Sequence, residues 1–289
     1  MDTYVARADA DRARELADTE SPFTIEIRFL DGLTETEQAA FAAAADRWAR
    51  VIVGDLPDVR IGDDVIDDVL IIAQGKKIDG PGHVLGSARP THLRVAPDGS
   101  LLQPCRGEMS FDVADLAEMA ADGTLGDVIT HEMGHVLGIG GSLWDRRRLV
   151  VPGPDNPAAL EDPVFVGSAA MAEYGRLTGG DGAPPRPVPV ENRGGSGTAR
   201  SHWRESVFDA ELMTGFVDPA GNPMSRVTVG CLEDLGYQVD YAAADPYTLP
   251  SPALLAARRH RRPRVVHPHP APGAHPVAAE ADPVLVVVK

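Results

Sequence analysis

The 289-residue sequence contains only two cysteines, Cys105 and Cys231, too few for a disulfide framework, although a single bridge between them stays open. No stretch is long and apolar enough to span a membrane. Basic residues are scarce, because 27 Lys and Arg stand against 43 Asp and Glu, a net charge of −16. This charge disfavours nucleic acid and anionic membranes as partners. A content of 43% hydrophobic residues is sufficient for a sizeable globular core.

Both ends of the chain lack the pattern of a packed element. The first twenty residues, MDTYVARADADRARELADTE, are polar and charged, so we expect a flexible segment over residues 1–21 and no signal peptide there. The protein is then intracellular, or a leader is missing from the sequence, or export uses another route. Residues 251–289 are rich in proline and carry a basic run and scattered histidines, which predicts a disordered tail.

The body of the chain, residues 22–250, indicates an α+β fold. A half-buried strand is predicted where apolar residues alternate with polar ones, at Phe23, Ile25, Ile27 and Phe29. A capping box, Thr34 with Glu37, precedes apolar residues at helical spacing. With further strands expected at 69–73, 84–88 and 109–112, residues 22–140 predict a mixed sheet and two main helices. Residues 141–250 are richer in Gly and Pro, and we expect them to be largely irregular.

The strongest chemical signal lies at Asp127–Gly138, which reads DVITHEMGHVLG and contains H-E-x-x-H as His131, Glu132 and His135. Residues four apart lie on one face of a helix, so the two imidazoles can reach the same zinc ion. Glu132 can then act as general base on a zinc-bound water.

The surroundings of this motif favour a real site over a chance match. An apolar arc beside the two histidines allows the helix to pack into a core while its ligands face a cleft. The residues of the arc are Leu125, Val128, Ile129, Met133 and Val136. Thr124 is a candidate N-cap, and Gly138 a natural end of the helix.

Two histidines are not enough, because a catalytic zinc usually takes three protein ligands. In the consecutive metzincin pattern the third histidine comes three residues after the glycine, and here that position is Gly141. The third ligand must therefore come from elsewhere, and His202 is the best candidate. The other histidines lie in the predicted strand region or in the basic tail. If His202 were too distant, Glu161 and Asp162 would be the first acidic alternatives.

The blocks HEMGHVLGIG, SHW…ELMTG and LEDLGY resemble the leishmanolysin-type metzincins. In that family an inserted segment displaces the third histidine, and a methionine downstream of it forms the Met-turn beneath the metal. The resemblance implies these roles for His202 and Met213. It also implies a metzincin-like zincin with an upper lobe, residues 22–140, an irregular lower lobe, residues 141–250, and an active-site cleft between them. A secreted location is what the family suggests.

These observations predict a zinc-dependent metalloendopeptidase. Zn²⁺ is the expected cofactor, with His131, His135 and His202 as ligands and Glu132 as the catalytic base. The expected partner is a peptide or protein substrate, which can pair with an edge strand at Val84–Ala88, while Thr214–Met224 lines a pocket beside the metal. We expect a monomer.

Two other functions remain open at this point. The chain could be a catalytically silent protein that binds zinc for structure or interaction, although a closed structural site needs no base such as Glu132. It could also be a zinc hydrolase of a non-peptide substrate, which a closed pocket rather than a long cleft would favour.

Overall fold

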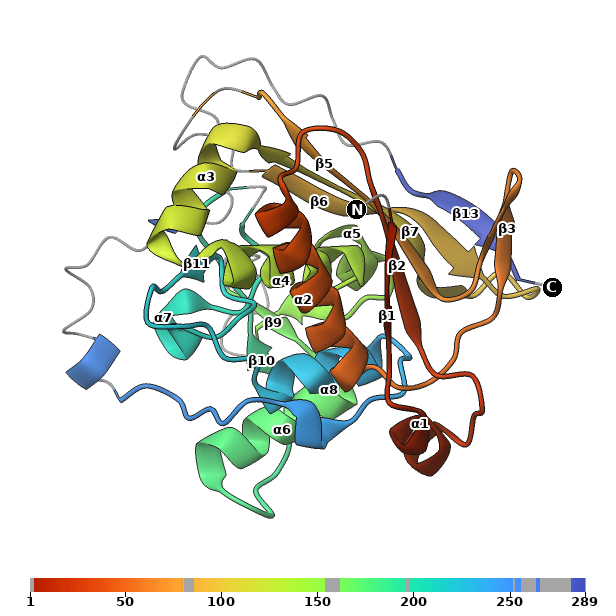
Figure 1. Ribbon diagram of the computed structural model, residues 1–289. Coiled ribbons are helices and arrows are strands. Elements are labelled where there is room, and N and C mark those ends of the chain that lie inside the picture. Colours follow the sequence, from red (N-terminus) through yellow and green to blue (C-terminus); the bar gives the residue numbers. More distant parts are fainter. Residues whose placement is uncertain are drawn as a thin grey trace.

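The computed structural model describes residues 3–78, 80, 86–153, 162–195, 198–251, 253–255, 264–265 and 282–288. Its largest element is a six-stranded mixed sheet with the strand order β1-β2-β5-β7-β6-β13 (Figure 1). In chain order these strands are β1 Thr3–Arg7, β2 Thr24–Phe29, β5 Val69–Lys76, β6 Gly86–Val95, β7 Leu101–Asp112 and β13 Val284–Val287. The strands β2, β5 and β7 are parallel to one another, β1 is antiparallel to β2, β6 is antiparallel to β7, and β13 is parallel to β6.

The sheet is apolar on both faces. The predicted alternation in β2 is confirmed, since Ile25 and Ile27 are fully buried in the main core. In β5, Ile71 joins the same core, whereas its neighbour Leu70 points to the other face and a smaller cluster. A hairpin of β3, Val59–Ile61, and β4, Asp64–Ile66, contributes to that second cluster. A strand buried on both faces explains why the apolar run in β5 is continuous rather than alternating.

Two helices cover the main-core face, as Figure 1 shows. Helix α2, Glu35–Val51, packs on β1 and β2, and its predicted capping box between Thr34 and Glu37 is confirmed. Helix α4, Leu125–Val136, packs on α2, β6 and β7, and it follows the shorter α3, Val113–Asp122. The indole Nε1 of Trp48 in α2 donates to the carbonyl of Thr130 in α4 at 2.9 Å, so a buried hydrogen bond fixes one helix against the other.

The second half of the chain consists of short elements. They are α5 Gly141–Arg146, β8 Val150–Pro152, β9 Pro163–Phe165, α6 Ser168–Gly179, β10 Val188–Pro189, α7 Glu205–Phe208, β11 Phe216–Val217, α8 Arg226–Asp234, the 3₁₀ helix η1 Tyr241–Ala243 and β12 Arg264–Val265. An aromatic group centred on Trp203 holds them together, with ring centroids 5.0 Å from Trp144 and 5.5 Å from Phe165. All three side chains belong to the same apolar cluster as the sheet and its helices, so one continuous core runs through both halves.

The expectation of a flexible segment over residues 1–21 needs correction. Strand β1 pairs with β2, and α1, Ala10–Ala17, has Asp9 as its N-cap, whose side chain accepts two backbone N–H groups. The segment buries small side chains, Ala6 and Ala13, rather than large apolar ones. Because alanine adds little to hydropathy, the sequence pattern gave no sign of this packing.

The expected disordered tail falls mostly outside the described residues. Where the structure does describe it, the expectation is corrected at β13, which pairs with His92–Val95 of β6. The N–H of Val288 extends this ladder to the carbonyl of Val95 at 2.9 Å, and the Val288 side chain is 7% exposed within the second cluster.

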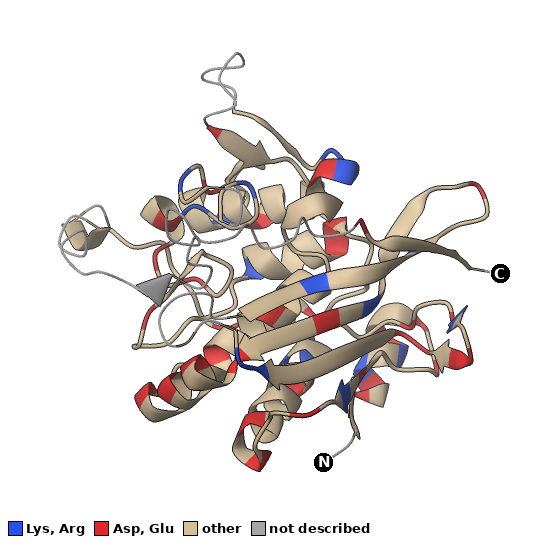
Figure 2. Cartoon of the chain, turned by 90° about the horizontal axis from the view of Figure 1, so that it is seen from above, with Lys and Arg blue, Asp and Glu red and all other residues tan. Residues whose placement is uncertain are grey.

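Within the described ranges, no helix has both the length and the apolar character needed to cross a membrane. Asp and Glu are spread over helices, loops and strands (Figure 2).

The docking of β13 can be tested with two neighbouring valines. Val288 is buried against the second cluster, whereas Val287 is 62% exposed. We expect Val288→Ala to lower the free energy of unfolding by about 1–2 kcal/mol, because it removes buried methyl groups. The matched control Val287→Ala should change it by less than about 0.5 kcal/mol. Urea unfolding of both variants beside the wild type provides the measurement, and equal curves for all three proteins would show that this strand does not dock.

Candidate metal centre

Helix α4 presents the H-E-x-x-H motif as the sequence predicts. The apolar arc of the helix is buried, with exposed fractions from 0% for Ile129 and Met133 to 6% for Leu125. Thr124 occupies the N-cap position but does not cap the helix, since its hydroxyl donates to Asp122 at 2.6 Å. The helix is therefore held by its packing in the core rather than by a side-chain cap.

His202 comes from a distant loop, between β10 and α7, and meets the two histidines of α4. The Nε2 atom of His202 lies 3.2 Å from that of His131 and 3.1 Å from that of His135, and the two helical Nε2 atoms are 3.0 Å apart. Two nitrogens bound tetrahedrally to zinc at 2.0–2.1 Å would be about 3.3 Å apart. The three imidazoles thus form a nearly equilateral group of the size that one zinc ion requires.

Each imidazole is oriented by a backbone carbonyl on its other nitrogen. The Nδ1 atoms of His131, His135 and His202 lie 2.7, 2.8 and 2.9 Å from the carbonyl oxygens of Leu212, Ile139 and Thr198 respectively. A carbonyl can only accept, so the proton of each neutral ring resides on Nδ1. All three Nε2 lone pairs then point at one another, an arrangement that suits a shared cation.

The carbonyl acceptors carry no side-chain signal, so sequence reasoning could not identify them. Each belongs to a segment that follows or faces the motif: the turn after α4, the loop before His202, and the turn at Leu212. Acidic Asp162, the alternative third ligand, instead forms an ion pair with Arg204 at 2.5 Å. Its neighbour Glu161 lies outside the described residues.

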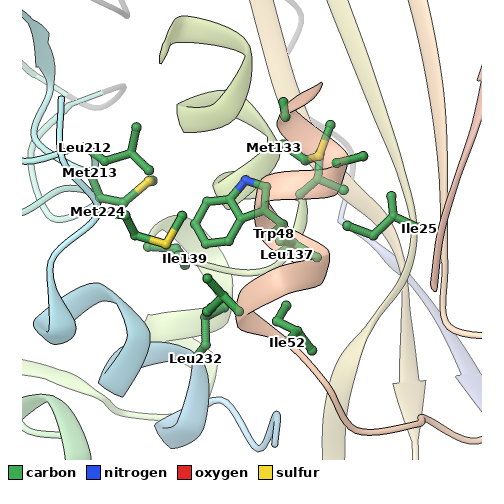
Figure 3. Packing of buried hydrophobic residues seen from close by; sticks show 14 of the residues in the cluster. Ile25, Trp48, Ile52, Met133, Leu137, Ile139, Leu212, Met213, Met224 and Leu232 are labelled. Carbon is green, nitrogen blue, oxygen red and sulfur yellow. The ribbon is translucent and has the colours of Figure 1, made fainter. Parts of the chain in front are cut away.

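Met213 supports the α4 backbone directly between the two helical histidines. A Cβ atom built on Gly134 would lie 2.8 Å from the Met213 Sδ and 3.0 Å from Cζ2 of Trp48. The glycine of the motif thus allows this close approach, and Figure 3 shows Met213 and Trp48 side by side in the core. Met213 is fully buried, and its carbonyl accepts the N–H of Trp203 at 2.9 Å, beside the third histidine.

His135 is more exposed than Glu132 and the other two histidines. Glu132 is 1% exposed and His202 is fully buried, whereas His135 is only half-buried. Desolvation lowers the pKa of His135 to about 4, and the hydrogen bond with Ile139 opposes this shift only in part. At neutral pH, His135 is therefore an unprotonated imidazole, which is the form that binds a metal.

Comparison with known proteins points to one family. The family model described as Leishmanolysin matches residues 91–250, more than half of the chain and all of the histidine group. The chain is 31% identical to leishmanolysin of Leishmania major over 144 residues, which are 49% of this chain and 23% of that protein. It is 28% identical to leishmanolysin of Leishmania chagasi over 221 residues, 73% of this chain and 35% of that protein.

An insect relative is similar over a shorter stretch. A leishmanolysin-like peptidase of Drosophila melanogaster is 38% identical over 60 residues, 20% of this chain and 9% of that protein. The chain thus spans about a third or less of the length of these curated relatives.

The lowered pKa of His135 predicts a pH dependence for the metal-free protein. An unfolded histidine titrates near pH 6.5, so between about 6.5 and 4 the unfolded chain binds a proton that the folded chain does not. The His135 contribution therefore destabilises the fold progressively as the pH falls through this window, and it is absent above it. Between pH 7 and pH 4, we expect the Tm of the chelator-treated wild type to fall more than the Tm of His135→Gln treated in the same way. A constant difference over that range would contradict this origin.

Proposed function

The chain belongs to the leishmanolysin family, and on that premise we propose that it is a zinc-dependent metalloendopeptidase. The observation that carries this proposal is the convergence of three Nε2 atoms within 3.0–3.2 Å of one another. Two of them come from an H-E-x-x-H helix and one from a loop 71 residues beyond His131. The chain covers only part of the length of these relatives. The peptidase activity of the whole protein is therefore itself a proposal.

His131, His135 and His202 would hold the zinc ion. Zinc bound there supplies Lewis acidity, which activates a water molecule and polarises the scissile carbonyl. Glu132 takes the proton of the attacking water on its carboxylate and delivers it to the leaving amine. The three backbone carbonyls keep the imidazoles oriented throughout, so the geometry of the ligands does not change with the proton transfers.

The proposed substrate is a peptide or protein bound along β6. The part of this strand at Gly86–Pro90 pairs with β7 on one side, and among the described residues β13 covers the other side only from His92 onward. An extended peptide can add to this edge by main-chain hydrogen bonds. The candidate edge at Val84–Ala88 overlaps this part, although residues 84 and 85 lie outside the described residues.

A metzincin-like division of the chain fits this arrangement. In the proposal, the sheet and helices of residues 22–140 form the upper lobe and residues 141–250 the lower lobe, with the histidine group between them. Met213 takes the Met-turn role, because it packs against Gly134 under the two helical ligands. The segment Thr214–Met224, which follows it directly, lines the pocket beside the metal.

The role of Glu132 is tested by exchanging its carboxylate for an amide of the same shape. Glu132→Gln should bind zinc as the wild type does, because Glu132 is not among the three proposed ligands. Hydrolysis of casein or of a quenched fluorescent peptide should fall about 10²–10⁴-fold, because both proton transfers lose their carrier.

The matched control for this experiment is Glu35→Gln, on the exposed first turn of α2, which should keep full activity. Near-normal hydrolysis by Glu132→Gln would mean that another group is the base. A wild-type protein that binds zinc but cleaves no peptide would contradict the endopeptidase proposal itself.

A further inference from the structure

A fully buried carboxylate lies directly behind the metal centre, and the mechanism above does not use it. Glu211 is 0% exposed, and its four hydrogen-bond partners are neutral groups. One oxygen, Oε2, accepts the backbone N–H of Met213 at 2.6 Å. The other, Oε1, accepts the N–H and the hydroxyl of Ser225 at 3.0 and 2.7 Å and the hydroxyl of Thr228 at 2.5 Å.

These partners suit an ionised carboxylate. The two backbone N–H groups can only donate. The Thr228 hydroxyl accepts the indole Nε1–H of Trp203 at 2.8 Å, so its own proton is available for Glu211. Burial raises the pKa of Glu211, and the bonds from Thr228, Ser225 and Met213 oppose that rise. A buried charge is costly unless hydrogen bonds satisfy it, and the four donors around Glu211 meet that requirement.

The peptide group that Glu211 binds also holds a histidine. The N–H of Met213 and the carbonyl of Leu212 are the two ends of one peptide unit. Glu211 accepts at the first end, and the Nδ1–H of His131 donates to the second at 2.7 Å. The carboxylate, the peptide and the imidazole therefore form one chain of hydrogen bonds that ends at the Nε2 of His131.

We propose that Glu211 is a positioning residue for His131: its carboxylate fixes and polarises the Leu212–Met213 peptide, and thereby strengthens His131 as a metal ligand. A charge-assisted hydrogen bond at the N–H places more negative charge on the carbonyl oxygen of the same peptide. That oxygen becomes a stronger acceptor for Nδ1–H, which raises the basicity of Nε2 and locks the ring orientation. This inference rests on the proposed zinc site.

The same carboxylate also supports Trp203, the residue that follows the third histidine. Its partner Thr228 holds the Trp203 indole, and the backbone N–H of Trp203 binds the carbonyl of Met213. His202 itself is oriented by the carbonyl of the Thr198–Ala199 peptide. The N–H of that peptide donates to a neutral group, the carbonyl of Gly195, at 2.8 Å, and not to a carboxylate. The direct electrostatic effect of Glu211 thus falls on His131.

The test compares zinc affinity in Glu211→Gln and Ser225→Ala. The first variant, Glu211→Gln, removes the negative charge. Its side-chain NH₂ group then faces donors that bind one of the two carboxylate oxygens in the wild type. The second removes one hydroxyl bond to Oε1 and the side-chain cap of α8, but leaves the Oε2–Met213 bond in place. We expect Glu211→Gln to weaken zinc binding about 10–100-fold in competition with a chromophoric chelator. Ser225→Ala should lose thermal stability and keep nearly wild-type affinity.

The outcomes separate this inference from the proposed function. Unchanged affinity in folded Glu211→Gln, or an equal loss in both variants, overturns the role of Glu211 while the zinc site stands. A wild type that binds no zinc overturns both. If Glu211→Gln does not fold, the amide proton of Met213 in ¹⁵N-labelled wild type decides. It should resonate well downfield of ordinary amides and shift when zinc is added, whereas an ordinary position that zinc does not move contradicts the proposal.

Discussion

Three hydrogen bonds from imidazole Nδ1 atoms to backbone carbonyls are the constraint on which the site depends. They turn three Nε2 atoms toward a single point, and they join α4 to the turn at Ile139, the loop at Thr198 and the turn at Leu212. A group of this kind does not form within one helix, because α4 brings only two of the three histidines to it. The chain must leave α4 and return, and the aromatic group around Trp203 holds the returning segment in the main core.

The sheet and α2 give this arrangement a fixed base. Trp48 both donates to the α4 backbone and packs against Gly134, so the motif helix has little freedom to rotate. Met213 contacts the same glycine from the side of the returning segment, which places the turn at Leu212 close enough for its carbonyl to reach His131. The same few contacts therefore pack the buried apolar side chains and orient His131.

The sequence predicted those features that repeat with the period of a helix or strand, or that use a specific side chain. The burial of β2, the capping box of α2 and the helix that carries the motif belong to this class. The packing of β1 and α1 escaped prediction because alanine provides it, and β13 because its partner strand is distant in the chain. Candidates for the site could be named from their chemistry, whereas the carbonyl acceptors and the relation of Glu211 to His131 involve backbone groups that no residue pattern encodes.

We propose that His202 completes a three-histidine zinc site with His131 and His135. The most direct measurement is the zinc content of the purified wild type and of His202→Ala after dialysis against a weak chelator. We expect about one zinc ion per wild-type chain, as a single three-histidine site requires, and loss of that ion from a variant that remains folded. Equal zinc retention by both proteins, or none in the wild type, would contradict it.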